Sequence, residues 1–178
     1  MKSITRSLAT LALLVSGTGM SLEVGDIAPD FSLPASDGKT YSLEQFKGKQ
    51  AIVIAWYPMA FTRGCTIECK SLAENGHLLR QFDISYFMAS VDTVEDNTKF
   101  AESTNADFPL LSDTTKEVAK AFDVLAIYGV PKRHTIYIGK DGKILMVDRK
   151  INAETSAQDI AANLEKLGVP KIALSSAD

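Results

Sequence analysis

The stretch AIVIAWYPMAFTRGCTIEC, residues 51–69, carries most of the information about the fold. Residues 51–57 form an unbroken apolar run of β-branched, small and aromatic side chains. Such a run is typical of a strand that is buried on both faces of a sheet. Pro58 ends the run, because proline has no N–H to donate to a neighbouring strand. We therefore expect a central strand that stops at Tyr57.

A helix is expected after this strand and a short loop. Its predicted range is residues 66–82, because apolar side chains recur there at helical spacing. The residues on this stripe are Cys65, Cys69, Leu72 and Leu79, with Leu78 and Phe82 alongside. The strand–loop–helix unit thus places the two cysteines at the start of a helix.

The rest of the chain continues the alternation of strands and helices. Further strands are predicted on either side of the Asp37–Gly38 turn, at residues 84–91 and 108–111, and in a hairpin at 134–149. Further helices are predicted at residues 94–103, 115–122 and 153–167. Early alternation favours parallel strands joined by helices, and the hairpin adds antiparallel strands. The predicted fold class is therefore α/β, with a mixed central β-sheet flanked by helices on both faces.

The N-terminus has the pattern of a secretory signal peptide. Lys2 and Arg6 supply a basic start, residues 8–15 are nearly all apolar, and small residues follow. The apolar run is too short to span a bilayer, which takes about 18 apolar residues or more. We expect a signal peptide at residues 1–21 and an exported, periplasmic protein without a membrane anchor. The alternative is a disordered or partly helical N-terminus on a cytosolic protein.

Composition points to one globular domain. The chain has 178 residues, of which 46% are hydrophobic and 23% are charged. We place this domain at residues 22–168, followed by a flexible tail at 169–178. The net charge is −3 without any block of like charges, so nucleic acid is not an expected partner.

Cys65 and Cys69 are too close in sequence to stabilise a fold by closing a long loop, which favours a reactive role.

Cys65 is expected at the first turn of the helix, where backbone N–H groups are unpaired and the helix dipole is positive. Both features favour a thiolate, which attacks a peroxide oxygen and becomes a sulfenic acid. Arg63 would add positive charge, the Thr62 hydroxyl could donate to the sulfur, and Glu68 could hold an arginine in place. The alternative is that both cysteines are small core residues, because free cysteine is among the most buried residue types.

The segment around Cys65 resembles the active site of the peroxiredoxin family. Pro58, Thr62 and Cys65 fit the family pattern Pro-x-x-x-Thr-x-x-Cys. A later segment resembles the one that carries the family's active-site arginine, here Arg133. The resemblance covers residues 24–167 and is closest to the bacterioferritin-comigratory-protein (PrxQ-like) branch. It implies a thioredoxin-like fold.

The resemblance also implies a role for each matching residue. Cys65 matches the cysteine that attacks the peroxide, and Pro58 matches the residue that shields its sulfur from water. Thr62 matches the residue that hydrogen-bonds the thiolate and the peroxide. Arg133 matches the arginine that stabilises the thiolate and the charge on the breaking O–O bond. The implied function is a thiol-dependent peroxidase for hydrogen peroxide or organic hydroperoxides.

Cys69 departs from the family pattern. A resolving cysteine in this branch often follows five residues after the first cysteine, whereas Cys69 follows Cys65 by four. Cβ atoms four residues apart on a helix are separated by about 5–6 Å. A disulfide needs about 3.5–4.5 Å between these atoms. Resolution by Cys69 therefore requires the first helical turn to unwind; otherwise an external thiol reduces the sulfenic acid.

The expected partners follow from this chemistry. They are the peroxide and a thioredoxin-like or other exported thiol reductant, and the chemistry requires no bound cofactor or metal. No separate C-terminal cysteine is present for an intersubunit disulfide, which favours a monomer.

Two other functions fit parts of the pattern. Cys65, Cys69 and His134 resemble the copper site of Sco-type proteins, since thiolates and imidazole suit copper. Against copper, Thr66 rather than a proline follows Cys65, and Arg133 stands where the peroxiredoxin arginine belongs. A disulfide oxidoreductase would use Cys-x-x-Cys, which is one residue shorter than the spacing here.

Overall fold

A computed structural model describes residues 21–172 of the chain. The expected signal peptide, except its last residue, and the end of the expected tail at 173–178 lie outside the described residues. Within residues 21–172, no helix is both long enough and apolar enough to cross a membrane.

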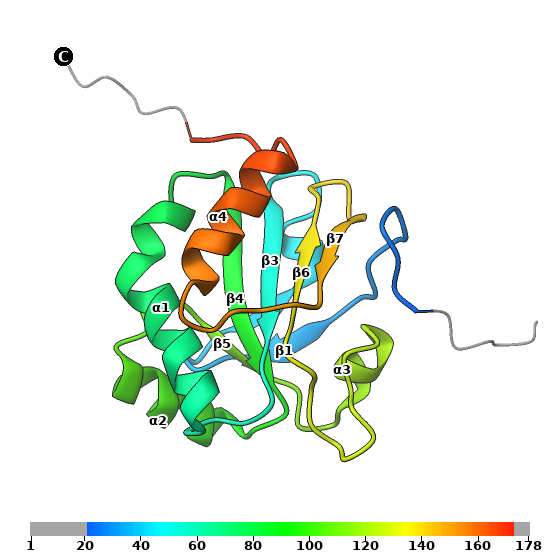
Figure 1. The fold of residues 1–178 in the computed structure, drawn as a ribbon. Helices are drawn as coiled ribbons and strands as arrows, with labels where there is room; N and C mark the ends of the chain where they lie inside the picture. The colour runs from blue at the N-terminus through cyan, green and yellow to red at the C-terminus, as the bar shows by residue number, and fades with distance from the viewer. Residues whose placement is uncertain (1–20, 173–178) are drawn as a thin grey trace, which may run out of the picture.

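A five-stranded mixed sheet forms the centre of the fold (Figure 1), in the order β5-β4-β3-β6-β7. Its strands are β3 (Ala51–Trp56), β4 (Ile84–Ser90), β5 (Leu110–Ser112), β6 (His134–Ile138) and β7 (Ile144–Asp148). The pairs β3–β4 and β4–β5 are parallel, whereas β3–β6 and β6–β7 are antiparallel. All six residues of β3 are buried, as its apolar run predicts. The predicted mixed sheet is confirmed.

Helices and loops cover both faces of this sheet (Figure 1). One face packs against α1 (Arg63–Leu79), α2 (Val94–Thr104) and α4 (Ser156–Lys166). The other face packs against α3 (Glu117–Ala121) and the N-terminal segment, which contains β1 (Ser32–Pro34), β2 (Thr40–Ser42) and the 3-10 helix η1 (Leu43–Gln45). Each face has its own cluster of buried apolar residues, so every element has a core to bury against.

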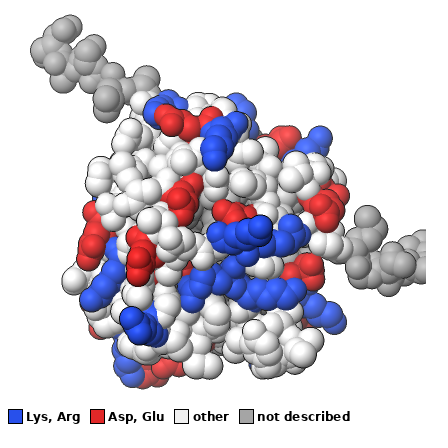
Figure 2. All heavy atoms as spheres, viewed as in Figure 1, with Lys and Arg blue, Asp and Glu red and all other residues white. Residues whose placement is uncertain are grey.

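The surface that carries α1 and α4 mixes both signs of charge (Figure 2). Lys and Arg side chains gather in a band across its middle, and Asp and Glu side chains lie around that band. The slightly negative net charge is therefore not spread evenly over the molecule.

Two boundaries differ from the sequence-based expectations. Helix α1 begins at Arg63 rather than residue 66, so Cys65 lies inside its first turn. The tail is not loose at residues 169–172. Val169 is buried, the Asp83 N–H donates to the Pro170 carbonyl, and Ile172 donates to the carbonyl of Gln81. Pro170 prevents a further helix, but it leaves the carbonyls free to pair with the loop before β4.

Candidate active site

The end of β3 is anchored by a buried polar network. The Tyr57 hydroxyl donates to Asn97 Oδ1 on α2. The Asn97 amide donates in turn to Ser112 Oγ at 2.8 Å and to the Leu111 carbonyl at 3.2 Å, both on β5. Because buried polar groups are costly to leave unpaired, this network fixes where the chain leaves the sheet. The loop that leads to Cys65 starts from this fixed point.

The loop itself is tightly bent. The Ala60 N–H donates to Asp92 Oδ2 at 2.9 Å, and the Thr62 hydroxyl donates to the Met59 carbonyl at 2.9 Å. Phe61 has a φ of 62°, a left-handed conformation that is strained for a bulky residue. Its ring packs edge-on against Phe100 of α2, with the ring centroids 5.3 Å apart. These contacts hold the turn that delivers the chain into α1.

Cys65 lies at the third position of α1 and is 1% exposed. Backbone N–H groups in the first turn of a helix have no carbonyl partner within the helix, and the dipole is positive there. The Arg133 guanidinium adds a full positive charge, because its Nη2 lies 3.1 Å from the Cys65 sulfur. The surroundings therefore stabilise a negative charge on this sulfur.

Glu68 holds the arginine in place from one turn further along α1. Its Oε2 pairs with Arg133 Nη1, and its Oε1 accepts a long hydrogen bond of 3.4 Å from Ser156 at the start of α4. Burial raises the pKa of Glu68, although the positive charge of Arg133 works in the opposite direction. Gly64 makes room for the pair, since a Cβ at this position would lie 3.1 Å from Arg133 Nη2.

Cys69 has a different environment from Cys65. It is fully buried, and its sulfur lies 3.1 Å from the hydroxyl of Thr104 on α2. Burial raises the pKa of the Cys69 thiol to about 11. Cys69 is therefore a neutral thiol at physiological pH.

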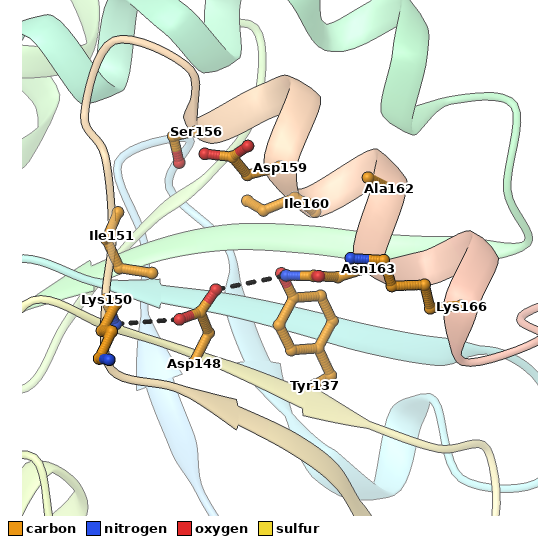
Figure 3. A pocket seen from close by; sticks show the side chains of 10 residues that line it. All are labelled: Tyr137, Asp148, Lys150, Ile151, Ser156, Asp159, Ile160, Ala162, Asn163 and Lys166. Carbon is orange, nitrogen blue, oxygen red and sulfur yellow. Dashed lines mark hydrogen bonds between the residues drawn. The ribbon is translucent and has the colours of Figure 1, made fainter.

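A polar pocket of about 280 Å³ lies between β7 and α4 (Figure 3). Its lining residues are Tyr137, Asp148, Lys150, Ile151, Ser156, Asp159, Ile160, Ala162, Asn163 and Lys166. None of the sequence-predicted site residues is among them, although the lining residue Ser156 donates a hydrogen bond to Glu68. Cys65 does not line this pocket, so the pocket does not enclose its sulfur.

The predicted site residues are brought together only in part. Cys65 and Arg133 are in contact, and Glu68 holds an arginine as expected. Thr62 does not donate to the sulfur, contrary to expectation, because its single hydroxyl proton is donated to the Met59 carbonyl. Arg63 is exposed.

Sequence reasoning missed several supporting residues. They are Gly64, Asp92, Thr104 and Ser156. All but Gly64 come from distant parts of the chain, and nothing in their local sequence distinguishes them from ordinary loop or helix residues. Gly64 gave no signal either, because the helix was predicted to begin at residue 66; α1 begins at Arg63, and a glycine is unfavourable inside a helix.

The copper-site alternative fails on geometry. His134 on β6 lies directly opposite Trp56 on the neighbouring strand β3, so the two side chains share one face of the sheet. Trp56 belongs to the core on the face covered by α3. Cys65 and Cys69 belong to the core on the opposite face. Among residues 21–172, no group of three or more His, Cys, Asp and Glu side chains is placed to hold a metal ion.

These features define a class of protein: a thiol-based redox protein on a thioredoxin-like α/β fold, with an arginine in contact with a cysteine at a helix start. Comparison with known proteins identifies the family, since residues 24–147 match the AhpC/TSA family. The chain therefore belongs to the AhpC/TSA family, among the peroxiredoxins related to Bcp.

Individual relatives agree with this assignment. Peroxiredoxin Bcp of Bacillus subtilis is 31% identical over 155 residues, which cover 83% of this chain and 98% of the relative. Peroxiredoxin Bcp of Escherichia coli is 36% identical over 130 residues, which cover 69% of this chain and 83% of the relative. The crystal structure of peroxidoxin BcpB from Mycobacterium tuberculosis has a TM-score of 0.73 at 31% identity, covering 82% of this chain and 97% of that one. The predicted fold and family resemblance are confirmed, and the Sco-type alternative finds no support.

Proposed function

We propose that this peroxiredoxin reduces peroxides through the Cys65 thiolate. The sulfur attacks one oxygen of the peroxide, an S–O bond forms, and the O–O bond breaks. The leaving oxygen takes up a proton and departs as water or an alcohol, which leaves Cys65 as a sulfenic acid. The observation that carries the proposal is the 3.1 Å contact between Arg133 Nη2 and the sulfur at the first turn of α1.

Arg133 is the group that we assign to charge stabilisation. A preorganised guanidinium lowers the energy of a transition state in which negative charge moves from sulfur to the leaving oxygen. Glu68 is the positioning residue, because it fixes Nη1 and thereby aims Nη2 at Cys65. Glu68 lies on the packed helix α1 and Arg133 lies directly before β6, so the pair is already in place and little reorganisation is needed when the peroxide arrives.

Thr62 and Pro58 complete the proposed site. The Thr62 proton is donated to the Met59 carbonyl, so its hydroxyl oxygen keeps lone pairs with which to accept the O–H of a bound peroxide. Pro58 is half-buried at the end of β3, and we assign it the shielding of the sulfur from water. Both roles are those of the matching residues in the family motif.

We assign resolution of the sulfenic acid to Cys69, after the first turn of α1 unwinds. Unwinding is needed because residues four apart on an intact helix are too far apart for a disulfide. The N-cap Thr62 makes no side-chain hydrogen bond to the helix, so the first turn is held by packing rather than by a cap. A thioredoxin-like thiol then reduces the disulfide, and if Cys69 does not react, an external thiol reduces the sulfenic acid directly.

We further propose that the protein works as an exported, periplasmic monomer. The support for export is the basic and apolar pattern of residues 1–21. The support for a monomer is that the two cysteines of the sequence, Cys65 and Cys69, both lie in α1, which provides no separate C-terminal cysteine for an intersubunit disulfide. Mass analysis of the protein purified from cell fractions tests this proposal. A periplasmic species that starts near residue 22 is expected, and a cytosolic species that keeps Lys2 and Arg6 would contradict it.

The test of the activity is stopped-flow mixing of the reduced protein with hydrogen peroxide, followed by intact mass. We expect oxidation orders of magnitude faster than that of free cysteine, and its loss in Cys65→Ser. Cys69→Ser keeps the fast oxidation and accumulates a species with one added oxygen. Retained activity in Cys65→Ser would rule out the assignment.

A further inference from the structure

The contact between Cys69 and Thr104 joins the second turn of α1 to the end of α2. The two side chains lie 3.1 Å apart, and both residues are buried. Thr104 already donates its hydroxyl proton to the carbonyl of Phe100 at 2.8 Å. Because a hydroxyl has only one proton, the S–H of Cys69 is the donor in this contact and Thr104 is the acceptor. Cys69 is thus held in its protonated form.

The same end of α2 also supports the segment before Cys65. The Phe61 ring packs against Phe100, and the Phe100 carbonyl accepts the Thr104 hydroxyl. Residues 100–104 therefore contact α1 and its preceding loop on both sides of the first turn. Cys69 must leave Thr104 to reach Cys65, because the two cysteines cannot bond while the helix is intact.

We propose that Thr104 is a positioning residue that sets how fast Cys69 is released to form a disulfide with Cys65. The inference rests on the proposed function, in which peroxide first converts Cys65 to a sulfenic acid. The Cys69 sulfur then bonds to the Cys65 sulfur, the S–O bond breaks, and the hydroxyl leaves as water with the thiol proton.

This release competes with a second oxidation. Another peroxide molecule can transfer an oxygen to the sulfenic acid, which gives a sulfinic acid and releases water or an alcohol. The longer Thr104 retains Cys69, the larger the share of Cys65 that follows this second route. Thr104 therefore sets the peroxide concentration at which the enzyme is inactivated.

The experiment mixes reduced mature protein with increasing hydrogen peroxide, quenches at set times and measures intact mass. The loss of two hydrogens reports the disulfide, and the gain of two oxygens reports the sulfinic acid. Thr104→Val keeps the side-chain volume and removes the acceptor for Cys69. We expect disulfide formation about fivefold faster, the effect of losing one ordinary hydrogen bond. The peroxide concentration that gives half sulfinic acid should rise by the same factor.

Three variants separate positioning from a general loss of packing. Thr104→Ser keeps the hydroxyl and should divide Cys65 between disulfide and sulfinic acid as the wild type does. Thr104→Ala removes the hydroxyl without the risk of crowding the Cys69 sulfur. Ser103→Ala is the matched control, because Ser103 donates to the same Phe100 carbonyl at 2.8 Å but has no contact with Cys69. It should leave the partition unchanged.

The outcomes also separate this inference from the proposed function. If wild-type Cys65 does not react rapidly with peroxide, the proposed function fails. If Cys65 reacts but Thr104→Val and Thr104→Ala form the disulfide at the wild-type rate or more slowly, the role of Thr104 is overturned. The same conclusion follows if no variant forms a disulfide at all.

Discussion

The two turns at the start of α1 each carry a cysteine, and their surroundings are opposite. In the first turn, Cys65 contacts the guanidinium of Arg133, which is paired with Glu68. In the second turn, Cys69 meets the Thr104 hydroxyl and apolar side chains, and burial raises its pKa to about 11. The comparison shows that partners brought by distant segments set the electrostatic surroundings of each cysteine on this helix. Residue type and helical position are not sufficient.

Replacing Arg133 with methionine should remove most of the difference in electrostatic surroundings between Cys65 in the first turn and Cys69 in the second. The variant keeps much of the apolar stem but loses the donor that points at the Cys65 sulfur. Loss of one preorganised donor to developing charge typically lowers a rate by about 10²-fold to 10³-fold. We expect a decrease of that size in the second-order rate of Cys65 oxidation, measured by stopped flow.

Lys132→Met is the matched control for this prediction. It removes the same charge one residue earlier, where Lys132 Nζ donates to the backbone carbonyl of Asp123 at 3.4 Å. Its oxidation rate should stay close to that of the wild type. Equal losses in both variants would mean that overall positive charge, rather than the aimed guanidinium, activates Cys65.

The second turn can be tested by alkylation of Cys69 in the Cys65→Ser background. A thiol whose pKa is raised from 9.0 to about 11 has, at pH 8, about 100-fold less thiolate than an ordinary one. Iodoacetamide should therefore modify folded protein at least about 100-fold more slowly than the urea-unfolded protein, by time-resolved mass measurement. The rate should rise about tenfold per pH unit up to pH 11, since the thiolate is the reactive form. Equal rates in the folded and unfolded protein would show that the second turn does not protect its cysteine.

The fold could be predicted because its signals are local. The apolar run of residues 51–57 defines β3, and the Asp141–Gly142 turn defines the hairpin of β6 and β7. Both depend on side-chain patterns within about ten residues. The packed segment at residues 169–172 was missed, because its hydrogen bonds go to the loop before β4, far away in sequence.

The site could be predicted only where a residue type and its spacing carry the chemistry. Cys65 and Arg133 were found because they match a motif, and Glu68 was found because it lies one turn along the same helix. The hydrogen bond of Thr62 was predicted wrongly, because the Met59 carbonyl competes for its single proton in a bend that the sequence does not reveal. Thr104 was missed, because only the packing of α2 on α1 brings it to Cys69.

The smallest expected effect on the oxidation rate of Cys65 concerns Glu68, which lies between the two cysteines in sequence and pairs with Arg133. Glu68→Gln keeps the shape and one acceptor oxygen but loses the charge that pairs with Arg133. The arginine is then held less firmly, so the rate of Cys65 oxidation should fall by about tenfold, less than in Arg133→Met. A faster reaction would mean instead that the negative charge of Glu68 hinders the neighbouring thiolate more than it helps to position the arginine.

A second measurement on the same variant tests the electrostatic reason. Burial raises the pKa of Glu68 above 4.5 in the folded protein, against the opposing effect of Arg133. A carboxyl whose pKa is raised on folding contributes stability below its unfolded pKa and loses that contribution as the pH rises. The free energy of unfolding of the wild type minus that of Glu68→Gln should therefore decrease as the pH is raised from below 4.5 to 7, by urea titration. If this difference in the free energy of unfolding increased over the same pH range, the attraction of Arg133 for the Glu68 carboxylate would outweigh the effect of burial. Arg133 would then stabilise a negative charge on Glu68 in the second turn as well as on Cys65 in the first.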